Sequence, residues 1–217
     1  MFAYNLRFVF APFQFLSTWA HELGHGIGAF LGGGSFDNMQ ITPGYGGLAF
    51  CKWPTNFSYG LSIIVGLIGP SLAGFFVLLF ARRLDKSRAV LWVLTAGLIL
   101  TGLVFSKDLF TRGVVFGLAF PIGVIAYHGN GYIRSLFAQI IGIVFCIQAI
   151  AGFDYFFLDA SKAVGGTDSH LADTQILAEY IGGPQLFWAL NVTLLSLVIL
   201  YLAARVATKK SPEQPTK

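Results

Sequence analysis

The stretch FVFAPFQFLSTWAHELGHGIGAFL, residues 8–31, places two histidines and a glutamate within an otherwise largely apolar segment. A helix needs about 20 predominantly apolar residues to cross the roughly 30 Å hydrocarbon layer of a bilayer, and this stretch is long enough. Ionisable side chains are costly at membrane depth, and where they occur they mark a functional site by default. The stretch therefore predicts a membrane-spanning helix that carries a polar site.

The composition of the whole chain indicates an integral membrane protein. Of its 217 residues, 55% are hydrophobic and only 11% are charged, and the mean hydropathy is +0.70. Soluble domains carry roughly 25% charged residues. We therefore expect an all-α polytopic membrane protein that forms a single domain over residues 1–217. About six transmembrane helices are predicted, near residues 8–31, 59–81, 89–105, 113–127, 135–152 and 185–204, with a disordered tail over about 206–217.

Two connections between the predicted spans are longer than the others. Residues 32–58 contain the segments MQI and GLAF on either side of a Pro43-Gly44-Tyr45-Gly46 turn signal, which predicts a short β-hairpin or a re-entrant loop after the first span. Residues 152–184 precede the last span, and about 171–181 of them read as a short helix that ends at Gly182-Gly183-Pro184.

The distribution of charge predicts the orientation of the chain. Residues 81–88 and 205–217 carry four basic residues each, and placing both segments in the cytoplasm also places Arg7 and Arg134 there. Ten Lys and Arg then lie inside and four outside, which is the positive-inside pattern with both termini cytoplasmic. A nucleic-acid-binding protein would instead collect its basic residues on one face, so we expect no nucleic-acid partner.

The polar residues of the first span have the spacing of a metal site. Successive residues of a helix advance by about 100°, so His21 and His25 lie on one face and one turn apart. Glu22 lies about 100° from His21, where it can reach a metal-bound water. These are the roles of H-E-x-x-H, which supplies two zinc ligands and a general base.

The alternative is a structural role, in which these side chains bond neighbouring helices. Asn or Gln would serve that role at lower cost, and Glu22 is the only carboxylate in the six predicted spans, with no basic residue in the other spans to pair with it. Beside the ligand face, small residues recur every fourth position and predict close helix packing: Ala20, Gly24, Gly28 and Gly32.

A catalytic zinc typically has three protein ligands and one open position. Five residues are candidates for the third ligand: His128, Asp168, His170, Asp173 and Glu179. His128 falls at the cytoplasmic end of the fourth span, on the side away from the motif. The other four lie in the external connection before the last span, on the side nearer the motif. We expect Cys51 and Cys146 to be structural bystanders, since their predicted depths differ.

Four patches of the sequence resemble one family. The segments HELGHGIGAFLGGG, ITPGYGGLAF, GLIGPSLAG and ADTQILAEYIGGPQLFW look like the bacterial B-like branch of the site-2-protease family of intramembrane zinc metallopeptidases. In that branch a small-Asp-Ala triplet opens the last of these segments, and Asp173 falls on its aspartate. Here Ala172 and Thr174 flank Asp173, so the triplet is imperfect. The asparagine-proline-aspartate-glycine motif of other branches is absent.

The resemblance implies a function for the predicted site. One zinc ion would be held by His21, His25 and Asp173 in a bacterial cytoplasmic membrane, and Glu22 would serve as general base in hydrolysing a peptide bond of a membrane-embedded substrate, a transmembrane helix. The hairpin region 39–50 would accept an extended substrate strand, or else would cover the site as a structural loop. A non-catalytic zinc-binding scaffold of the same family, or a hydrolase of a lipid or small amide, are the alternatives. A zinc transporter is disfavoured because the middle spans lack Asp, Glu and His in their cores.

Overall fold

The computed structural model describes residues 2–151 and 172–208 of the chain. The described residues are mostly helical, with one small hairpin. The helices are α1 (Phe2–Leu31), α2 (Asn56–Ala81), α3 (Leu84–Val104), α4 (Leu109–His128), α5 (Gly131–Ala151), α8 (Asp173–Tyr180) and α9 (Gln185–Thr208). The strands are β1 (Ser35–Ile41) and β2 (Gly47–Lys52), which pair antiparallel as the predicted hairpin.

Four helices of the described chain, α2, α3, α4 and α9, are long and apolar enough to cross a membrane, and a shorter apolar helix covers Gly131–Ile147. The chain is therefore an integral membrane protein, while the count of six spans and the single domain over 1–217 stay predictions. Several helix ends differ from the expected ones. α3 begins at Leu84 and α4 at Leu109, several residues before the apolar runs, and α9 continues to Thr208 into the predicted tail. The rest of that tail lies outside the described residues.

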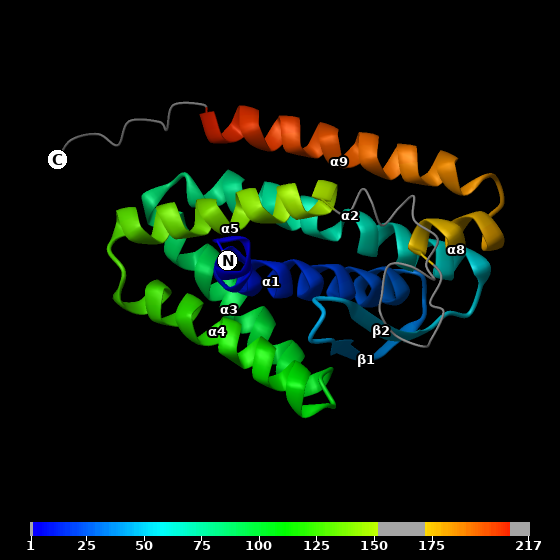
Figure 1. Ribbon diagram of the computed structural model, residues 1–217, viewed down its shortest axis with the longest axis horizontal. Coiled ribbons are helices and arrows are strands. Elements are labelled where there is room, and N and C mark those ends of the chain that lie inside the picture. Colours follow the sequence, from blue (N-terminus) through cyan, green and yellow to red (C-terminus); the bar gives the residue numbers. More distant parts are fainter. Residues whose placement is uncertain (1, 152–171, 209–217) are drawn as a thin grey trace.

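The helices lie in layers with α1 inside (Figure 1). α9 runs along the top of this view, α2 and α5 form the next layer, and α1 lies beneath them with α3 and α4 on its other side. The main core joins α1 to α3, α4, α5 and the hairpin, and Trp19 of α1 donates a hydrogen bond from Nε1 to Thr101 Oγ1 of α3, at 2.8 Å. The turn of α1 that precedes the two histidines is thus fixed inside the bundle.

The hairpin is anchored on both sides. The backbone N–H of Met39 donates to the Phe105 carbonyl in the α3–α4 connection, and that of Ile41 donates to Thr111 Oγ1 at the start of α4, each at 2.8 Å. In the turn, Tyr45 has a φ of 66°, and Thr18 of α1 donates from its hydroxyl to the Tyr45 carbonyl at 2.6 Å. These bonds hold the hairpin turn against α1, three residues before His21.

α8 and α9 form a corner that packs on α2. Ile63 and Leu67 of α2 contact Leu177 of α8 and Ala189 and Val192 of α9 in one buried cluster. The chain turns between α8 and α9 at Gly182-Gly183-Pro184, where the sequence predicts that the short helix ends. Gly182 and Gly183 have φ values of 102° and 86°, which glycine adopts without strain. The start of α8 is therefore held beside α2.

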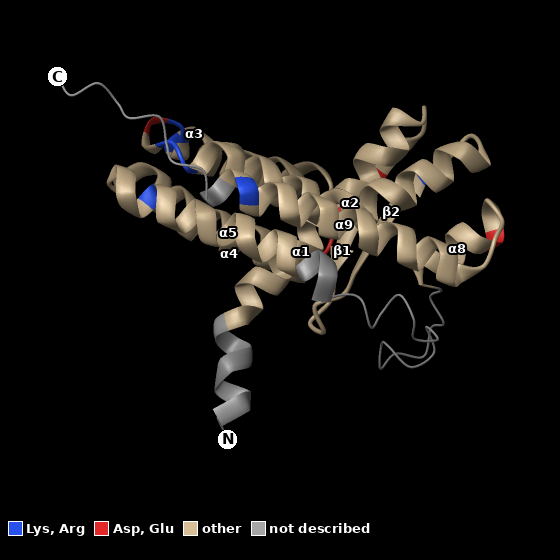
Figure 2. Ribbon diagram, turned by 90° about the horizontal axis from the view of Figure 1, so that it is seen from above, with Lys and Arg blue, Asp and Glu red and all other residues tan. Residues whose placement is uncertain are grey.

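Charged residues are unevenly placed along the molecule (Figure 2). Most blue ribbon lies at the end where α2 turns into α3, where α5 begins and where α9 ends, while the hairpin and α8 lie at the opposite end. The residues of the basic end are Arg82, Arg83, Lys86, Arg88, Arg134 and Arg205. The structure thus separates the basic segments from α8, as the sequence predicts; the direction in which the chain crosses a membrane stays a prediction.

Candidate metal centre

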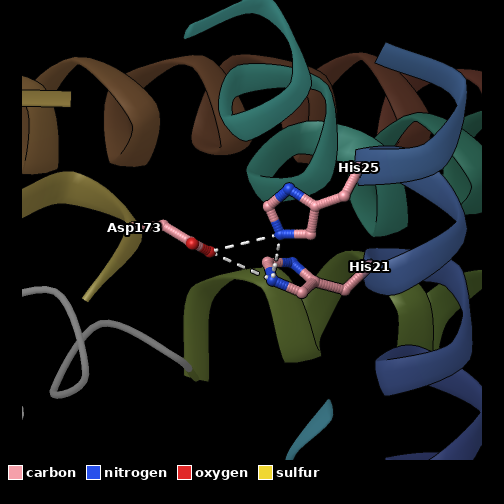
Figure 3. A group of neighbouring side chains, drawn as sticks. All are labelled: His21, His25 and Asp173. Carbon is pink, nitrogen blue, oxygen red and sulfur yellow. Dashed lines mark hydrogen bonds and ion pairs between the residues drawn. The ribbon is translucent and has the colours of Figure 1, made fainter. Parts of the chain in front are cut away.

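Two histidine rings project from one face of α1. Their centroids are 4.5 Å apart and their planes are nearly perpendicular, at 88°. The Nε2 atoms of His21 and His25 approach to 3.0 Å, so both rings direct the same nitrogen at one point (Figure 3). A neutral imidazole has one nitrogen that lacks a hydrogen, and this arrangement allows both such nitrogens to face one cation. The spacing of the motif therefore has the geometry that two metal ligands need.

Asp173 reaches the same point from α8, of which it is the first residue. Its Oδ2 lies 3.1 Å from His21 Nε2 and 3.5 Å from His25 Nε2. Within the described part of the chain these three residues form the group of His, Cys, Asp and Glu side chains that could hold a metal ion, with ligand atoms all within 4.8 Å of one another. The structure thus brings together the residues that the motif and the resemblance named.

The other candidates for the third ligand are not in this group. Glu179 lies six residues further along α8, where it accepts a hydrogen bond from Gln175. His128 ends α4 at the basic end of the molecule, and its ring contacts Tyr127. Asp168 and His170 lie outside the described residues. The role of Asp173 as a ligand is still a prediction, but its position is the one that role requires.

The spacing of the three donors suits zinc. In tetrahedral zinc sites the nitrogen and oxygen ligands lie about 2.0–2.2 Å from the ion, which places neighbouring ligand atoms about 3.3 Å apart. The three separations here, 3.0, 3.1 and 3.5 Å, bracket that value. Two imidazoles and one carboxylate are also a ligand set that catalytic zinc sites use. The residues present therefore fit a zinc ion.

The charge of Asp173 complements this role. Burial would raise the pKa of its carboxyl, but the neighbouring His25 and His21 outweigh that effect and hold the pKa below its usual range. The carboxyl is consequently ionised at neutral pH and offers a negative oxygen to a cation. Of the three side chains His21 is the most exposed, at 27%.

Glu22 is almost fully buried, at 3% exposure, beside the cluster. It takes part in none of the ion pairs among the described residues, so a structural salt bridge does not account for it there. Its carboxylate occupies the space over Gly47, the first residue of β2. A Cβ atom at position 47 would overlap the Glu22 carboxylate and lie 2.7 Å from its Cγ. The hairpin therefore leaves room for the carboxylate because position 47 is a glycine.

The small residues of α1 have the packing role that the sequence predicts. A Cβ at Gly24 would lie 2.7 Å from the Val65 carbonyl oxygen, and one at Gly28 would lie 2.7 Å from Ser62 Cα. Backbone therefore meets backbone between α1 and α2. On another face of α1, Gly26 makes room for the Phe36 ring of β1. The motif helix thus contacts both of its neighbours through glycines.

The cysteines do not join the donor group. Burial, assisted by the charge of Glu22, raises the pKa of the Cys51 thiol to about 12, so it stays protonated and is a poor metal ligand. Cys146 is buried in α5, where its thiol faces the Ser71 carbonyl at 3.8 Å. Both remain free cysteines, as expected of structural bystanders.

Sequence reasoning did not identify Gly47, Ser62 or Gly66 as neighbours of the site. Ser62 donates from its hydroxyl to the His25 carbonyl at 2.7 Å, and the ring of His25 lies over Gly66. Small residues in apolar segments ordinarily indicate helix packing. No signal in the sequence distinguishes a glycine that faces a helix from one that faces a histidine ring.

A comparison with protein-family models gives a match over most of the chain. The family model described as Peptidase M50B-like matches residues 1–203, whereas no curated protein and no solved structure gives a match. Peptidases of the M50 family are metalloproteases in general and depend on zinc. Because the match includes α1, the hairpin, α8 and nearly all of α9, this chain belongs to the Peptidase M50B-like family.

Proposed function

We propose that this chain is an intramembrane zinc endopeptidase that hydrolyses peptide bonds in membrane-embedded segments of other proteins. The observation that carries the proposal is the convergence of His21, His25 and Asp173 beside a buried Glu22, inside a largely apolar helical bundle. The three donors would hold the ion. Bound zinc supplies Lewis acidity, which lowers the pKa of water and polarises a carbonyl.

We assign Glu22 the role of general base. It lies next to both His21 and Asp173 in the chain's fold, yet it is not one of the three converging donors. Its carboxylate would take a proton from the attacking water and pass a proton to the leaving nitrogen. The missing side chain at Gly47 leaves room for that carboxylate, which is almost fully buried.

Among the described residues, the outer edge of β2 has no backbone hydrogen-bond partner and could accept a substrate strand. The backbone N–H groups of Met39 and Ile41 donate to the α3–α4 region, so the backbone hydrogen-bonding groups of these two residues point away from β2. In an antiparallel pair, the backbone groups of the residues directly opposite then point away from β1. These opposite residues are Ala49 and Gly47. The backbone groups of these two residues therefore lie on the outer edge of β2, and Gly47 is next to Glu22. An unwound substrate segment could pair there by strand addition.

Replacing Ala49 with Pro is expected to lower kcat/KM about tenfold. Proline removes the outward N–H and places its ring where a substrate strand would pair, whereas the β1–β2 bonds do not use that N–H. A lost hydrogen bond is worth about 0.5–1.5 kcal/mol, and the blocked edge adds to the effect. Ala49→Ser keeps the N–H and serves as the control. Unchanged kcat/KM in a zinc-loaded, folded Ala49→Pro protein would exclude pairing at this edge.

The proposed activity can be tested without a known substrate. The purified protein is reconstituted in liposomes with detergent-extracted membrane proteins from the expression host, and new N-termini are identified by mass spectrometry. We expect new termini inside apolar segments, their loss after zinc chelation and their return when zinc is restored. A zinc-loaded protein that produces no such termini would support the scaffold alternative. Release of fatty acids or of small amines in place of peptides would support the lipid or amide hydrolase.

The basic end of the molecule suggests an orientation in the membrane. We propose that this end is cytoplasmic, which places both termini inside and the metal centre nearer the outer face of a bacterial cytoplasmic membrane. Reporter proteins inserted at residues 82–88 and 153–170 test it. The first fusion should report the cytoplasm and the second the exterior, and the reverse result would overturn the orientation.

A further inference from the structure

The ring of His25 rests on a specific part of α2. Because Gly24 and Gly28 let the two backbones meet, Ser62 comes next to His25 and bonds it twice. The Ser62 hydroxyl donates to the His25 carbonyl at 2.7 Å, and the Ser62 carbonyl oxygen lies 3.1 Å from His25 Nδ1. One residue of α2 thus contacts both the backbone and the ring of the same histidine.

Gly66 makes the second of these contacts possible. It follows Ser62 by four residues, so its N–H is the helix partner of the Ser62 carbonyl. A Cβ at position 66 would overlap the His25 ring at Cε1 and Nδ1 and would lie 2.6 Å from Nε2. The imidazole therefore fills the volume that a side chain at position 66 would take. With any other residue there, the ring could not reach the carbonyl in this pose.

The carbonyl decides which nitrogen of His25 carries the hydrogen. A carbonyl oxygen can only accept a hydrogen bond, so a neutral ring bonded to it must carry its hydrogen on Nδ1. The lone pair is then on Nε2, the atom that faces His21 and Asp173. His21 has no corresponding acceptor at its Nδ1 among the described residues. The two histidines thus differ, with His25 fixed and His21 less constrained.

We propose that the Ser62 carbonyl and Gly66 form a seat that fixes the tautomer and direction of His25, with Gly66 as a positioning residue. The effect on metal binding rests on the proposed function, since a His25 ring held in this tautomer presents its Nε2 lone pair to the metal. Acceptors at the second nitrogen of a ligating histidine are a general means of orienting it, and their loss weakens metal binding by about 10- to 100-fold. Here the acceptor is a backbone atom, and the glycine is the residue that a substitution can alter.

The tautomer can be measured directly in the metal-free protein. Histidine labelled with ¹⁵N is introduced, and spectra are recorded about two pH units above the usual imidazole pKa of about 6.5, where rings are neutral. The His25 signals are identified by their absence in His25→Gln. We expect a protonated Nδ1 and a bare Nε2 in the wild type and in Ser62→Ala, which keeps the carbonyl. In Gly66→Ala this pattern is lost.

Metal affinity provides the second measurement. Cobalt, whose visible spectrum reports its ligand geometry, replaces zinc in a titration of each protein. Gly66→Ala should bind cobalt about 10- to 100-fold more weakly with an altered spectrum. Gly117→Ala is the matched control, because a Cβ at Gly117 of α4 would meet no atom within 4 Å. It should behave as the wild type does.

The outcomes separate this proposal from the proposed function. A bare Nδ1 on His25 in the wild type overturns the seat, even if the protein binds metal. A protonated Nδ1 in a wild type that binds no metal supports the seat and overturns only the metal centre. A Gly66→Ala protein that keeps both the wild-type tautomer and the wild-type affinity overturns the role of Gly66. If Gly66→Ala does not fold, the wild-type and Ser62→Ala spectra decide the seat.

Discussion

Glu22→Gln is expected to lower the cleavage rate by about 10²- to 10⁴-fold while the protein keeps its zinc, because a positioned general base contributes about that much. The amide has the shape of the carboxylate but cannot accept the proton. The three converging donors do not include Glu22, so metal binding should survive. The kcat is measured on the peptide from which the most abundant membrane cleavage product arises. Zinc per chain is measured by elemental analysis.

A second variant tests the position of the carboxylate and leaves its chemistry intact. A Cβ at Gly47 would overlap the Glu22 carboxylate, so Gly47→Ala should displace it and lower kcat by about 10²-fold, as misplacements near 1 Å can. Gly44→Ala is the control in the same hairpin, since a Cβ there meets no atom within 4 Å. If Glu22→Gln retained wild-type kcat, Glu22 would not be the base. If it lost zinc, Glu22 would instead be needed to hold the metal.

Much of the helical framework was predictable, because apolar runs of this length have few alternatives. The ends were less so. α4 begins at Leu109 because Asp108 caps it, with its carboxylate accepting from the Thr111 N–H at 2.8 Å. α3 begins with the charged segment at 84–88, which forms a helix although it is not apolar. Hydropathy identifies the apolar residues that lie within the membrane, but it does not detect the hydrogen bonds with which a helix begins. The predicted spans were therefore shorter than the helices at these ends.

The local spacing of the sequence predicted only the site residues that lie on one helix. His21, Glu22 and His25 share a turn of α1, so their spacing already fixes their relation. Asp173 lies about 150 residues further on. The charge topology placed it, with three other candidates, on the side nearer the motif, and only the family resemblance selected it from those four. The contacts of Glu22 with Gly47 and of His25 with Gly66 join different elements through a residue that has no side chain. Such contacts depend on how the hairpin and α2 pack on α1, which no local periodicity encodes.

His21→Ala and Asp173→Ala are each expected to weaken zinc binding by more than about 100-fold, since losing even a residue that only hydrogen-bonds a zinc ligand costs about 10- to 100-fold. His21 Nε2 and Asp173 Oδ2 lie 3.1 Å apart and come from elements about 150 residues apart in the chain. Each removal would leave two donors, fewer than the three that catalytic zinc sites use. The measurement is zinc affinity by competition with a chelating dye, on protein shown to be folded by its thermal transition.

Glu179→Ala is the matched control, because Glu179 is an acid of the same short helix that bonds Gln175 and not the histidines. It should bind zinc as the wild type does. Asp168→Ala and His170→Ala complete the set, since the sequence left both residues open as ligands. If one of these lost zinc while Asp173→Ala kept it, the third ligand would have to be reassigned. If His21→Ala kept a full equivalent of zinc, the pair of histidines on α1 could not be the metal site, and the proposed peptidase mechanism would fail with it.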